Sequence, residues 1–369
     1  MKLQRSPGIY FEWSGDTLVA RHVNSHIKCH LGIPVVELLN RLENPQEENE
    51  LLDSYPPNSR ADVRATLQGL LQGGFLREIP AEQSESVLAG TEGWWEAWGT
   101  QARAFHFASR DANFASFRGE RARQLADQLA QAGPAPLIAK RCPGAPRIPL
   151  PPVQAAIDEP LGHVLETRRT HRQFHDSPVS LDTFSTVLHY SFAPLGYQDT
   201  GAFGTQMVKA SPAGGSRHDG ECYPACFRVE GVLPGLYHYD ACGHALELVR
   251  PDFPPELVLE LTAGQDHCAR SAFTCFLTTV PERITYKYCH PRAYRMWMYN
   301  VGYVGQTFAL VCTALGLGAF ETAAFDDTRV EQALDVDPRQ EFAAFILGAG
   351  VPVLTEQGLP PDFHPVPPP

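Results

Sequence analysis

Two adjacent residues, Lys287 and Tyr288, have side chains with high reference pKa values and are suited to moving a proton. A tyrosine phenol stays protonated at neutral pH unless a nearby cation stabilises its phenolate, and Lys287 is a candidate for that cation. We therefore take Tyr288 as the candidate base. Adjacent side chains on a strand point to opposite faces, so the pair predicts a loop or a helix end here. In isolation, the same two residues would be more typical of a surface loop.

Three arginines, Arg168, Arg169 and Arg172, lie within about one helical turn of each other, around the hydroxyl group of Thr170. Guanidinium groups bind phosphate through two parallel hydrogen bonds, and a hydroxyl group can complete the shell. The pattern indicates an anion site, although taken alone it is more typical of a solvated basic helix end.

A run of small residues follows at positions 211–215, namely Ser211, Pro212, Ala213, Gly214 and Gly215. Small side chains allow the backbone to approach a flat ligand, which a large side chain would block. An ordinary turn before the next strand is the alternative interpretation of this segment.

Two other patterns of reactive residues do not define sites. His171 and His175 have the i, i+4 spacing of helical zinc ligands, but no HExxH motif or third ligand accompanies them, so we expect no metal. Residues 216–219 contain serine, histidine and aspartate, but no G-x-S-x-G motif surrounds the serine, and adjacency in sequence is not triad geometry.

Composition limits the class of protein. A chain of 369 residues is expected to form two domains, and a net charge of −12 argues against a general nucleic-acid binder. The nine cysteines show no CxxC spacing, and the first residues contain no apolar secretory segment. We therefore expect reduced thiols and a cytoplasmic protein.

Residues 301–320 are almost entirely apolar or small and could in principle cross a membrane. Glycines lie near both ends of this segment, and its aromatic neighbours gather at one end only. The pattern favours a central helix that is buried on all sides within a large soluble fold and makes no membrane contact.

The chain divides into three regions by its patterns. Residues 1–90 predict a helix at 34–42, a second helix capped by Ser59 and ended by Gly73, and a strand at 75–79. This order suggests a small winged-helix-like domain, which either docks a peptide or partner or serves as a packing extension. Residues 91–150 predict a helical and proline-rich linker or wrapped arm, and residues 151–369 predict the catalytic domain.

Three strands are predicted in the catalytic domain. They cover residues 226–229, 235–239 and 246–249, and the last two are joined by a turn at 240–243. Helical segments flank them, so the sequence predicts a mixed α and β domain.

Residues 165–350 resemble the SagB-type branch of the nitroreductase-like flavoproteins, the thiazole- and oxazole-forming dehydrogenases that mature ribosomal peptides. Residues 168–174 resemble the opening RRS-x-R-x-F motif of this branch, and residues 211–223 its SP-x-GG-x-RH…E-x-Y run. Residues 231–239 resemble G-x-x-PGLYHY, and residues 302–318 a long helix ending in GLG. The Lys287-Tyr288 pair is the motif that most separates this branch from ordinary nitroreductases.

The resemblance implies an α+β nitroreductase-like FMN fold, with a central mixed or antiparallel sheet flanked by helices, and a homodimer with FMN bound at the subunit interface. The FMN phosphate would be held by Arg168, Arg169, Thr170 and Arg172. The flavin ring and its chain would contact residues 211–215, and the ring's reactive edge would lie along Thr322, Ala323 and Ala324.

The sequence departs from the family pattern at three places. Ala323 and Ala324 stand where ordinary nitroreductases have glutamate and glycine, which weakens the case for reduction of nitro compounds. Ala213 replaces a serine, and Asp219 with Gly220 replaces the proline after His218.

The implied reaction is oxidation of peptide azolines to azoles, with a precursor peptide as substrate and a cyclodehydratase as a possible partner. A flavin would take the hydride, and Lys287 with Tyr288 would remove the proton. Two alternatives remain open. One is a related flavoenzyme that acts on another peptide modification, such as a dehydroamino acid, or on a small molecule. The other is a non-catalytic scaffold of a peptide-modifying complex.

Overall fold

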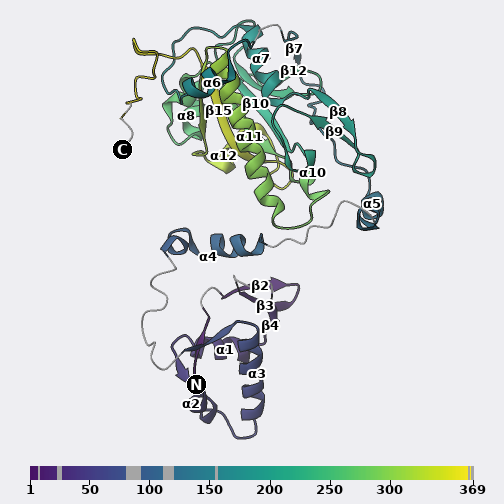
Figure 1. Cartoon of the computed structure of the whole chain (residues 1–369), viewed down its shortest axis with the longest axis vertical. Coiled ribbons are helices and arrows are strands. Elements are labelled where there is room, and N and C mark those ends of the chain that lie inside the picture. Colours follow the sequence, from purple (N-terminus) through teal and green to yellow (C-terminus); the bar gives the residue numbers. More distant parts are fainter. Residues whose placement is uncertain are drawn as a thin grey trace. The chain divides into compact units, whose positions relative to one another are not determined.

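The computed structural model describes residues 1–6, 9–22, 27–79, 93–110, 120–153, 157–364 and 366. The chain forms two compact units, Met1–Asn113 and Phe114–Pro369 (Figure 1). Each unit has its own hydrophobic core.

Before residue 80, the first unit contains three helices and a small antiparallel sheet. The helices are α1 (Ile33–Arg41), α2 (Glu48–Asp53) and α3 (Arg60–Gln72). In the sheet, β1 (Lys2–Arg5) lies between β5 (Gln46–Glu47) and β6 (Leu76–Ile79). The leucines of α1 and α3 that recur at helical spacing are buried against this sheet, so both predicted helices and the predicted strand are confirmed.

A second small sheet in the same unit is formed by β2 (Ile9–Ser14), β3 (Thr17–His22) and β4 (Lys28–His30). Its outer strand β2 carries Phe11 and Trp13, which are both exposed. This strand pairs with β3 on one side only, within the part of the chain that the structure describes.

The segment between the predicted domains is helical at first and then extended. It contains α4 (Gly93–Ala108) and α5 (Glu120–Ala132), and it ends in β7 (Arg147–Pro149). Strand β7 pairs with β12 (Ala245–Arg250), and the ammonium group of Lys140 lies 2.6 Å from the carboxylate of Glu341. The proline-rich stretch before the catalytic domain therefore lies along the main sheet.

The second unit is built on a seven-stranded antiparallel sheet in the order β14-β15-β13-β10-β11-β12-β7. The strands not yet given are β10 (Gly220–Cys226), β11 (Gly235–Asp240), β13 (Phe273–Thr279), β14 (Gly318–Thr322) and β15 (Phe342–Gly350). A separate hairpin pairs β8 (Gly196–Asp199) with β9 (Thr205–Val208).

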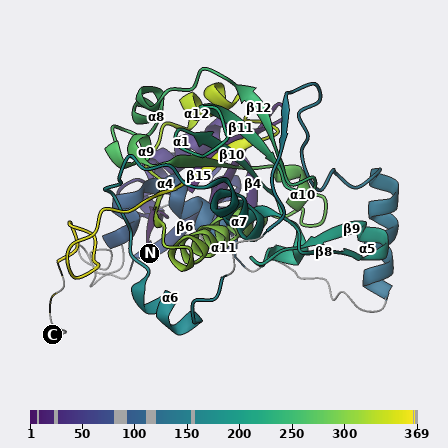
Figure 2. The same cartoon turned by 90° about the horizontal axis from the view of Figure 1, so that it is seen from above.

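Helices cover both faces of this sheet (Figure 2). On one face lie α7 (Leu181–Phe192) and α11 (Ala293–Ala314), and on the other lie α8 (Pro255–Leu261), α9 (Asp266–Arg270) and α12 (Asp327–Leu334). Alternate residues of β13 point to opposite faces: Phe273 packs under α7 and α11, whereas Phe276 packs under α8 and α12. Both faces are therefore buried, and the expected α+β fold is confirmed.

Two of the three predicted strands of the catalytic domain are confirmed as β11 and β12, which pair antiparallel. The third prediction is wrong, because the strand ends at Cys226 instead of beginning there. Pro224 lies inside β10, opposite Cys275 of β13. Because a proline has no N–H group to donate to a neighbouring strand, a proline in a sequence argues against a central strand.

The apolar segment at 301–320 does not form one helix. Helix α11 ends at Ala314, Gly316 adopts a left-handed conformation (φ 72°), and the chain then enters β14. The helix is also not buried on all sides, because Met298, Tyr299 and Tyr303 are exposed in the single chain. No helix among the described residues is long and apolar enough to cross a membrane.

Candidate active site

The arginine segment lies along the outer strand of the main sheet, directly after the short helix α6 (Leu161–Thr167). Thr170 forms a parallel bridge with Ala319 of β14, and the N–H group of His171 donates to the carbonyl of Ala319 at 2.9 Å. Thr322 is the last residue of β14, and residues 323–324 follow it immediately. The structure therefore brings two of the predicted site segments to the same sheet edge.

The three arginines of this segment have different surroundings. The guanidinium group of Arg168 makes no hydrogen bond or ion pair within the described ranges, and its charge lowers the pKa of Glu321, which burial raises. Arg169 donates to the carbonyls of Glu166 and Arg168, both at 2.8 Å. Arg172 lies 3.0 Å from the carboxylate of Asp362.

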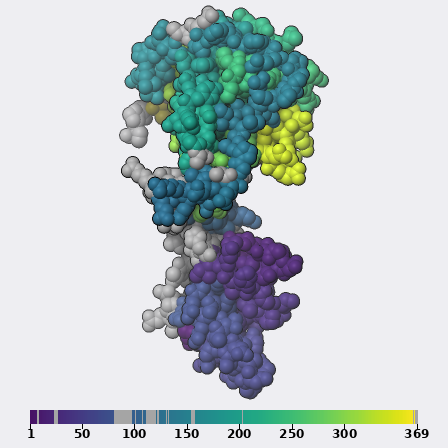
Figure 3. Space-filling view, turned by 90° about the vertical axis from the view of Figure 1, so that its right-hand side faces the viewer, coloured from purple at the N-terminus to yellow at the C-terminus, as the bar shows by residue number. Residues whose placement is uncertain are grey.

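The C-terminal segment thus covers part of the predicted anion site. The Asp362 contact uses Arg172, and the guanidinium carbon of Arg169 lies 5.0 Å from the ring centroid of Phe363. This segment, yellow in Figure 3, lies on the surface of the second unit. Arg168 is consequently the arginine that remains available for an anionic ligand.

Side-chain hydrogen bonds hold residues 322–324 at the end of β14. The hydroxyl group of Thr322 accepts from the N–H group of Ala324 at 3.1 Å and donates to Gln265 at 2.9 Å. The amide of Gln265 in turn donates to the carbonyl of Ala324 at 2.6 Å. The side chain of Thr322 is therefore used to shape the backbone after β14.

The small-residue loop packs against the middle of α11. The hydroxyl groups of Ser211 and Thr307 are 2.7 Å apart, and the N–H group of Gly214 donates to the side-chain oxygen of Asn300 at 3.1 Å. Gly215 has φ 62°, and a Cβ atom there would lie 2.1 Å from the phenol oxygen of Tyr288. The glycine therefore brings the loop and the candidate base into contact.

The loop and the arginine segment lie on opposite sides of α11. Gly305 faces Glu321, because a Cβ atom at Gly305 would lie 3.1 Å from the Glu321 carboxylate. Thr307, which contacts Ser211, is two residues further and so points about 200° around the helix from Gly305. A single chain therefore holds two separated groups of predicted site residues.

Lys287 and Tyr288 come after helix α10 (Pro281–Thr285) and its C-cap residue Tyr286, so the predicted helix-end position is confirmed. The N–H groups of both residues donate to the carbonyl of Ile284, and the ammonium group of Lys287 lies 5.3 Å from the ring centroid of Tyr288. Burial lowers the pKa of Lys287 and raises that of Tyr288.

Tyr288 also borders an apolar cavity of about 350 Å³. Its walls include Ile284, Tyr294, Trp297 and Phe342. The ring of Trp297 meets those of Tyr294 and Phe342 edge to face, at centroid distances of 5.1 and 5.4 Å. A cavity with these walls can take an apolar or aromatic group beside the candidate base.

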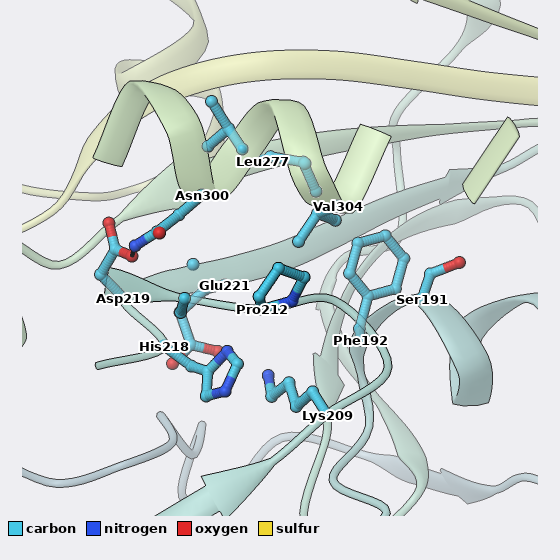
Figure 4. A pocket seen from close by; sticks show the side chains of 13 residues that line it. Ser191, Phe192, Lys209, Pro212, His218, Asp219, Glu221, Leu277, Asn300 and Val304 are labelled. Carbon is cyan, nitrogen blue, oxygen red and sulfur yellow. Dashed lines mark hydrogen bonds between the residues drawn. The ribbon is translucent and has the colours of Figure 1, made fainter. Parts of the chain in front are cut away.

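A second pocket, with charged groups in a mostly apolar lining, lies next to Pro212 (Figure 4). The side chain of Lys209 extends toward His218, while Asn300 donates to Asp219 at 2.7 Å on the other side. Burial lowers the pKa of Lys209 to about 8 and that of His218 to about 4. Sequence reasoning missed Lys209, whose only signal was its position two residues before the small-residue loop.

Buried charges connect this region to the centre of the sheet. His238 is fully buried, with Nδ1 3.0 Å from Glu247 and Nε2 3.1 Å from Glu221. Burial alone would lower the pKa of His238, but hydrogen bonds with Cys142 and Glu221 raise it to about 10. Burial would raise the pKa of Glu221, but His238 and Arg283 lower it to about 2. His238 is therefore an imidazolium between two carboxylates.

The same residues do not suit a metal ion. Cys142, His238 and Glu247 offer ligand atoms within 4.8 Å of one another. Both ring nitrogens of His238 already face carboxylates, and a metal needs a neutral imidazole with a free lone pair. In the described part of the chain, this cluster is accounted for as an ion network.

Comparison with known proteins assigns the class. Residues 165–350, half of the chain, match the nitroreductase family. The chain belongs to this family of flavoprotein oxidoreductases, and both the arginine segment and the Lys287-Tyr288 pair lie inside the matched region.

Two relatives carry names that refer to trifolitoxin. The trifolitoxin-processing protein TfxB of Rhizobium leguminosarum bv. trifolii is 30% identical over 175 residues, which cover 46% of this chain and 47% of TfxB. The match therefore spans about half the length of that relative. The trifolitoxin operon protein TfxC of the same organism is 24% identical over 302 residues, 78% of this chain and 81% of TfxC. A chain of the E. coli microcin synthetase McbBCD complex is similar over 72% of this chain and 98% of its own length, with 18% identity and a TM-score of 0.42.

Proposed function

We propose that this protein is an FMN-dependent dehydrogenase of the SagB type that oxidises peptide azolines to azoles during the maturation of a ribosomal peptide. The observation that carries the proposal is the Lys287-Tyr288 pair, held at a helix end against Gly215 in a member of the nitroreductase family. The similarity to TfxB, whose name assigns it to trifolitoxin processing, supports a peptide substrate.

The residues present fit a flavin phosphate at the edge of β14. Arg168 has a guanidinium group without a hydrogen-bond partner, and buried Nδ1 of His171 beside it also has none within the described ranges. Arg168 and Thr170 would hold the phosphate, with Arg169 and Arg172 as the outer cations. Residues 211–215 and 322–324 would line the ring. Bound FMN would supply the group that accepts a hydride.

The protein's own contribution is to take the proton. Oxidation of an azoline removes one hydrogen as a hydride and one as a proton from ring carbons, so the product is two hydrogens lighter. The proton would go to the Lys287-Tyr288 pair, where the lowered pKa of Lys287 favours an amine that can accept it. The apolar cavity beside Tyr288 would hold a neighbouring part of the substrate and exclude water.

A homodimer would complete the site. Within one chain, the small-residue loop and the arginine segment lie on opposite sides of α11. A two-fold partner could place its loop beside the first chain's arginines, and the exposed apolar face of α11 would be covered in such a dimer. We further propose that the first unit docks the precursor peptide or a cyclodehydratase, and that the protein is cytoplasmic, in keeping with nine free cysteines.

The test is incubation of the purified protein with a precursor peptide that carries azolines, followed by mass analysis. Loss of two hydrogens per ring is the expected result, and gain of two would instead support the alternative of a reductase acting on another modification. A protein that lacks flavin absorbance even after incubation with FMN would support a non-catalytic scaffold.

The same assay tests the proposed pair. Lys287→Ala and Tyr288→Phe should each reduce turnover by at least about 100-fold, within the usual range for loss of a general base, while flavin absorbance is retained. Turnover at the normal rate in both variants would contradict the assignment.

A further inference from the structure

Arg217 is a buried cation that has no carboxylate partner among the described residues. Its residue surface is only 4% exposed, and its guanidinium carbon lies 5.2 Å from the ring centroid of Tyr286. One N–H group donates to the carbonyl of Phe203 at 2.7 Å, whereas buried Nε has no hydrogen-bond partner among the described residues. Burial of a charge is costly unless an opposite charge or a function compensates for it.

The fold places Arg217 beside the proton-transfer pair through two contacts. Arg217 directly follows the 3-10 turn Gly214–Ser216, and Gly215 in that turn touches the phenol of Tyr288. Phe203, whose carbonyl accepts from Arg217, has its ring 4.8 Å from the ammonium group of Lys287. The guanidinium group, the ammonium group and the phenol therefore converge on one region.

We propose that Arg217 is a positioning residue that favours the proton-accepting form of the Lys287-Tyr288 pair, an inference that rests on the role proposed for that pair. A fixed positive charge disfavours a nearby ammonium group and favours a nearby phenolate, so it acts in the same direction on both members. Arginine keeps its proton throughout the accessible pH range, whereas a lysine that must accept a proton cannot also be the permanent cation.

The pKa directions agree with this geometry. Burial lowers the pKa of Lys287, and the charge of Arg217 lowers it further. Burial raises the pKa of Tyr288, and Arg217 opposes that rise.

The nearby acidic groups are engaged elsewhere. Asp219 accepts from Asn300 and Thr279, and Glu221 pairs with Arg283 and His238. Among the other titratable groups, Tyr286 lies under the guanidinium group of Arg217, and His290 borders the same cavity as Tyr288. Arg217 is thus the cation that acts on both members of the pair.

The first experiment measures the pH dependence of single-turnover flavin reduction by an azoline peptide in the FMN-loaded protein. In Arg217→Gln, the midpoint of the rise in rate with pH should shift to higher pH by about one unit. The rate at neutral pH should therefore fall by about tenfold. Arg217→Lys keeps a positive charge and should restore most of the rate. Arg217→Met keeps much of the aliphatic volume and replaces the glutamine variant if that one does not fold.

A second experiment needs no peptide. The tyrosinate absorbance of Tyr288 is followed against pH as the difference between the protein and its Tyr288→Phe variant. The midpoint of the Tyr288 titration should be at least about one pH unit higher in the Arg217→Gln variant than in the protein that retains Arg217. The matched control is Arg228→Gln, whose guanidinium group also caps backbone carbonyls, those of Arg270 and Ser271, but lies beyond the other end of β10. This control should leave the midpoint unchanged.

The two experiments separate the failure of this inference from the failure of the proposed function. If the peptide is not oxidised but the Tyr288 midpoint still shifts, the azoline assignment is wrong and the role of Arg217 stands. If Lys287→Ala abolishes turnover while the midpoint and the pH profile stay unchanged in Arg217→Gln, the role of Arg217 is overturned.

Discussion

At the scale of single residues, the three arginines of the anion segment are not equivalent. Arg169 satisfies two backbone carbonyls close to it in sequence, and Arg172 pairs with a carboxylate 190 residues further along the chain. Arg168 has neither kind of partner within the described ranges. Desolvation of a guanidinium group costs free energy. An anionic ligand compensates for that cost best where no protein group already binds the guanidinium group.

Arg168→Ala should therefore weaken FMN binding much more than Arg169→Ala. We expect a rise in Kd of at least about tenfold for the first variant, since a charge-assisted hydrogen bond contributes about 1.5–3 kcal/mol. For Arg169→Ala we expect less than about threefold, because its guanidinium group is engaged locally. Fluorescence titration with FMN measures both constants, and equal losses in the two variants would contradict the distinction.

At the scale of elements, one ion network joins four segments of the second unit. Four side chains, all buried or nearly so, are connected in series. They are Arg283 of α10, Glu221 of β10, His238 of β11 and Glu247 of β12. Arg283 also donates to the carbonyls of Leu137 and His218. The network therefore ties the helix that precedes Lys287 to the sheet and to the segment before it.

This network predicts a pH window for stability. The pKa of His238 is raised to about 10, so its contribution is complete below its unfolded value of 6.5 and is lost as the pH rises through 10. The pKa of Glu221 is lowered to about 2, so its contribution is complete above 4.5 and is lost as the pH falls through 2. Together they stabilise the fold most between pH 4.5 and 6.5.

The variant His238→Gln tests this window. Removal of one partner from a buried ion network costs about 3–5 kcal/mol, so the variant should unfold at a clearly lower temperature at pH 6. The difference from the natural chain should shrink as the pH rises toward 10. Thermal denaturation followed by circular dichroism measures it, and a difference that stays constant over this range would exclude a charged His238.

At the scale of the whole molecule, α11 separates two groups of predicted site residues and exposes an apolar face. Met298, Tyr299 and Tyr303 lie on this face, and Tyr299 is 55% exposed. Contiguous exposed apolar surface of this kind is typical of a protein–protein interface. A homodimer through this face would explain both features.

Tyr299→Glu should accordingly convert the proposed dimer to a monomer and weaken FMN binding at the same time. A buried unpaired carboxylate at an interface opposes association, and the site would lose the half that the partner supplies. Analytical ultracentrifugation with FMN titration measures both effects. Leu233→Glu, at a position 78% exposed in the turn before β11, is the control and should remain dimeric.

The sequence by itself was sufficient for the class of protein and for local structure. Helices α1 and α3 and strands β11 and β12 follow from periodicity and turn residues within a few positions. The helix end before Lys287 follows from the need for two adjacent side chains to act together. The start of β10 was missed because Pro224 mimics a strand boundary, whereas Gly316 and Gly318 marked the end of α11 to within a few residues.

Only the tertiary structure decided the partners of the charged side chains. Arg168 stays available for a ligand because Asp362 and Phe363 contact Arg172 and Arg169. The surroundings of Arg217 are set by its contacts with Phe203 and Tyr286. Secondary structure is set by short-range steric and hydrogen-bonding preferences that a sequence displays directly. Charge environments are set by contacts between segments distant in sequence and by burial, and those exist only after the chain has packed.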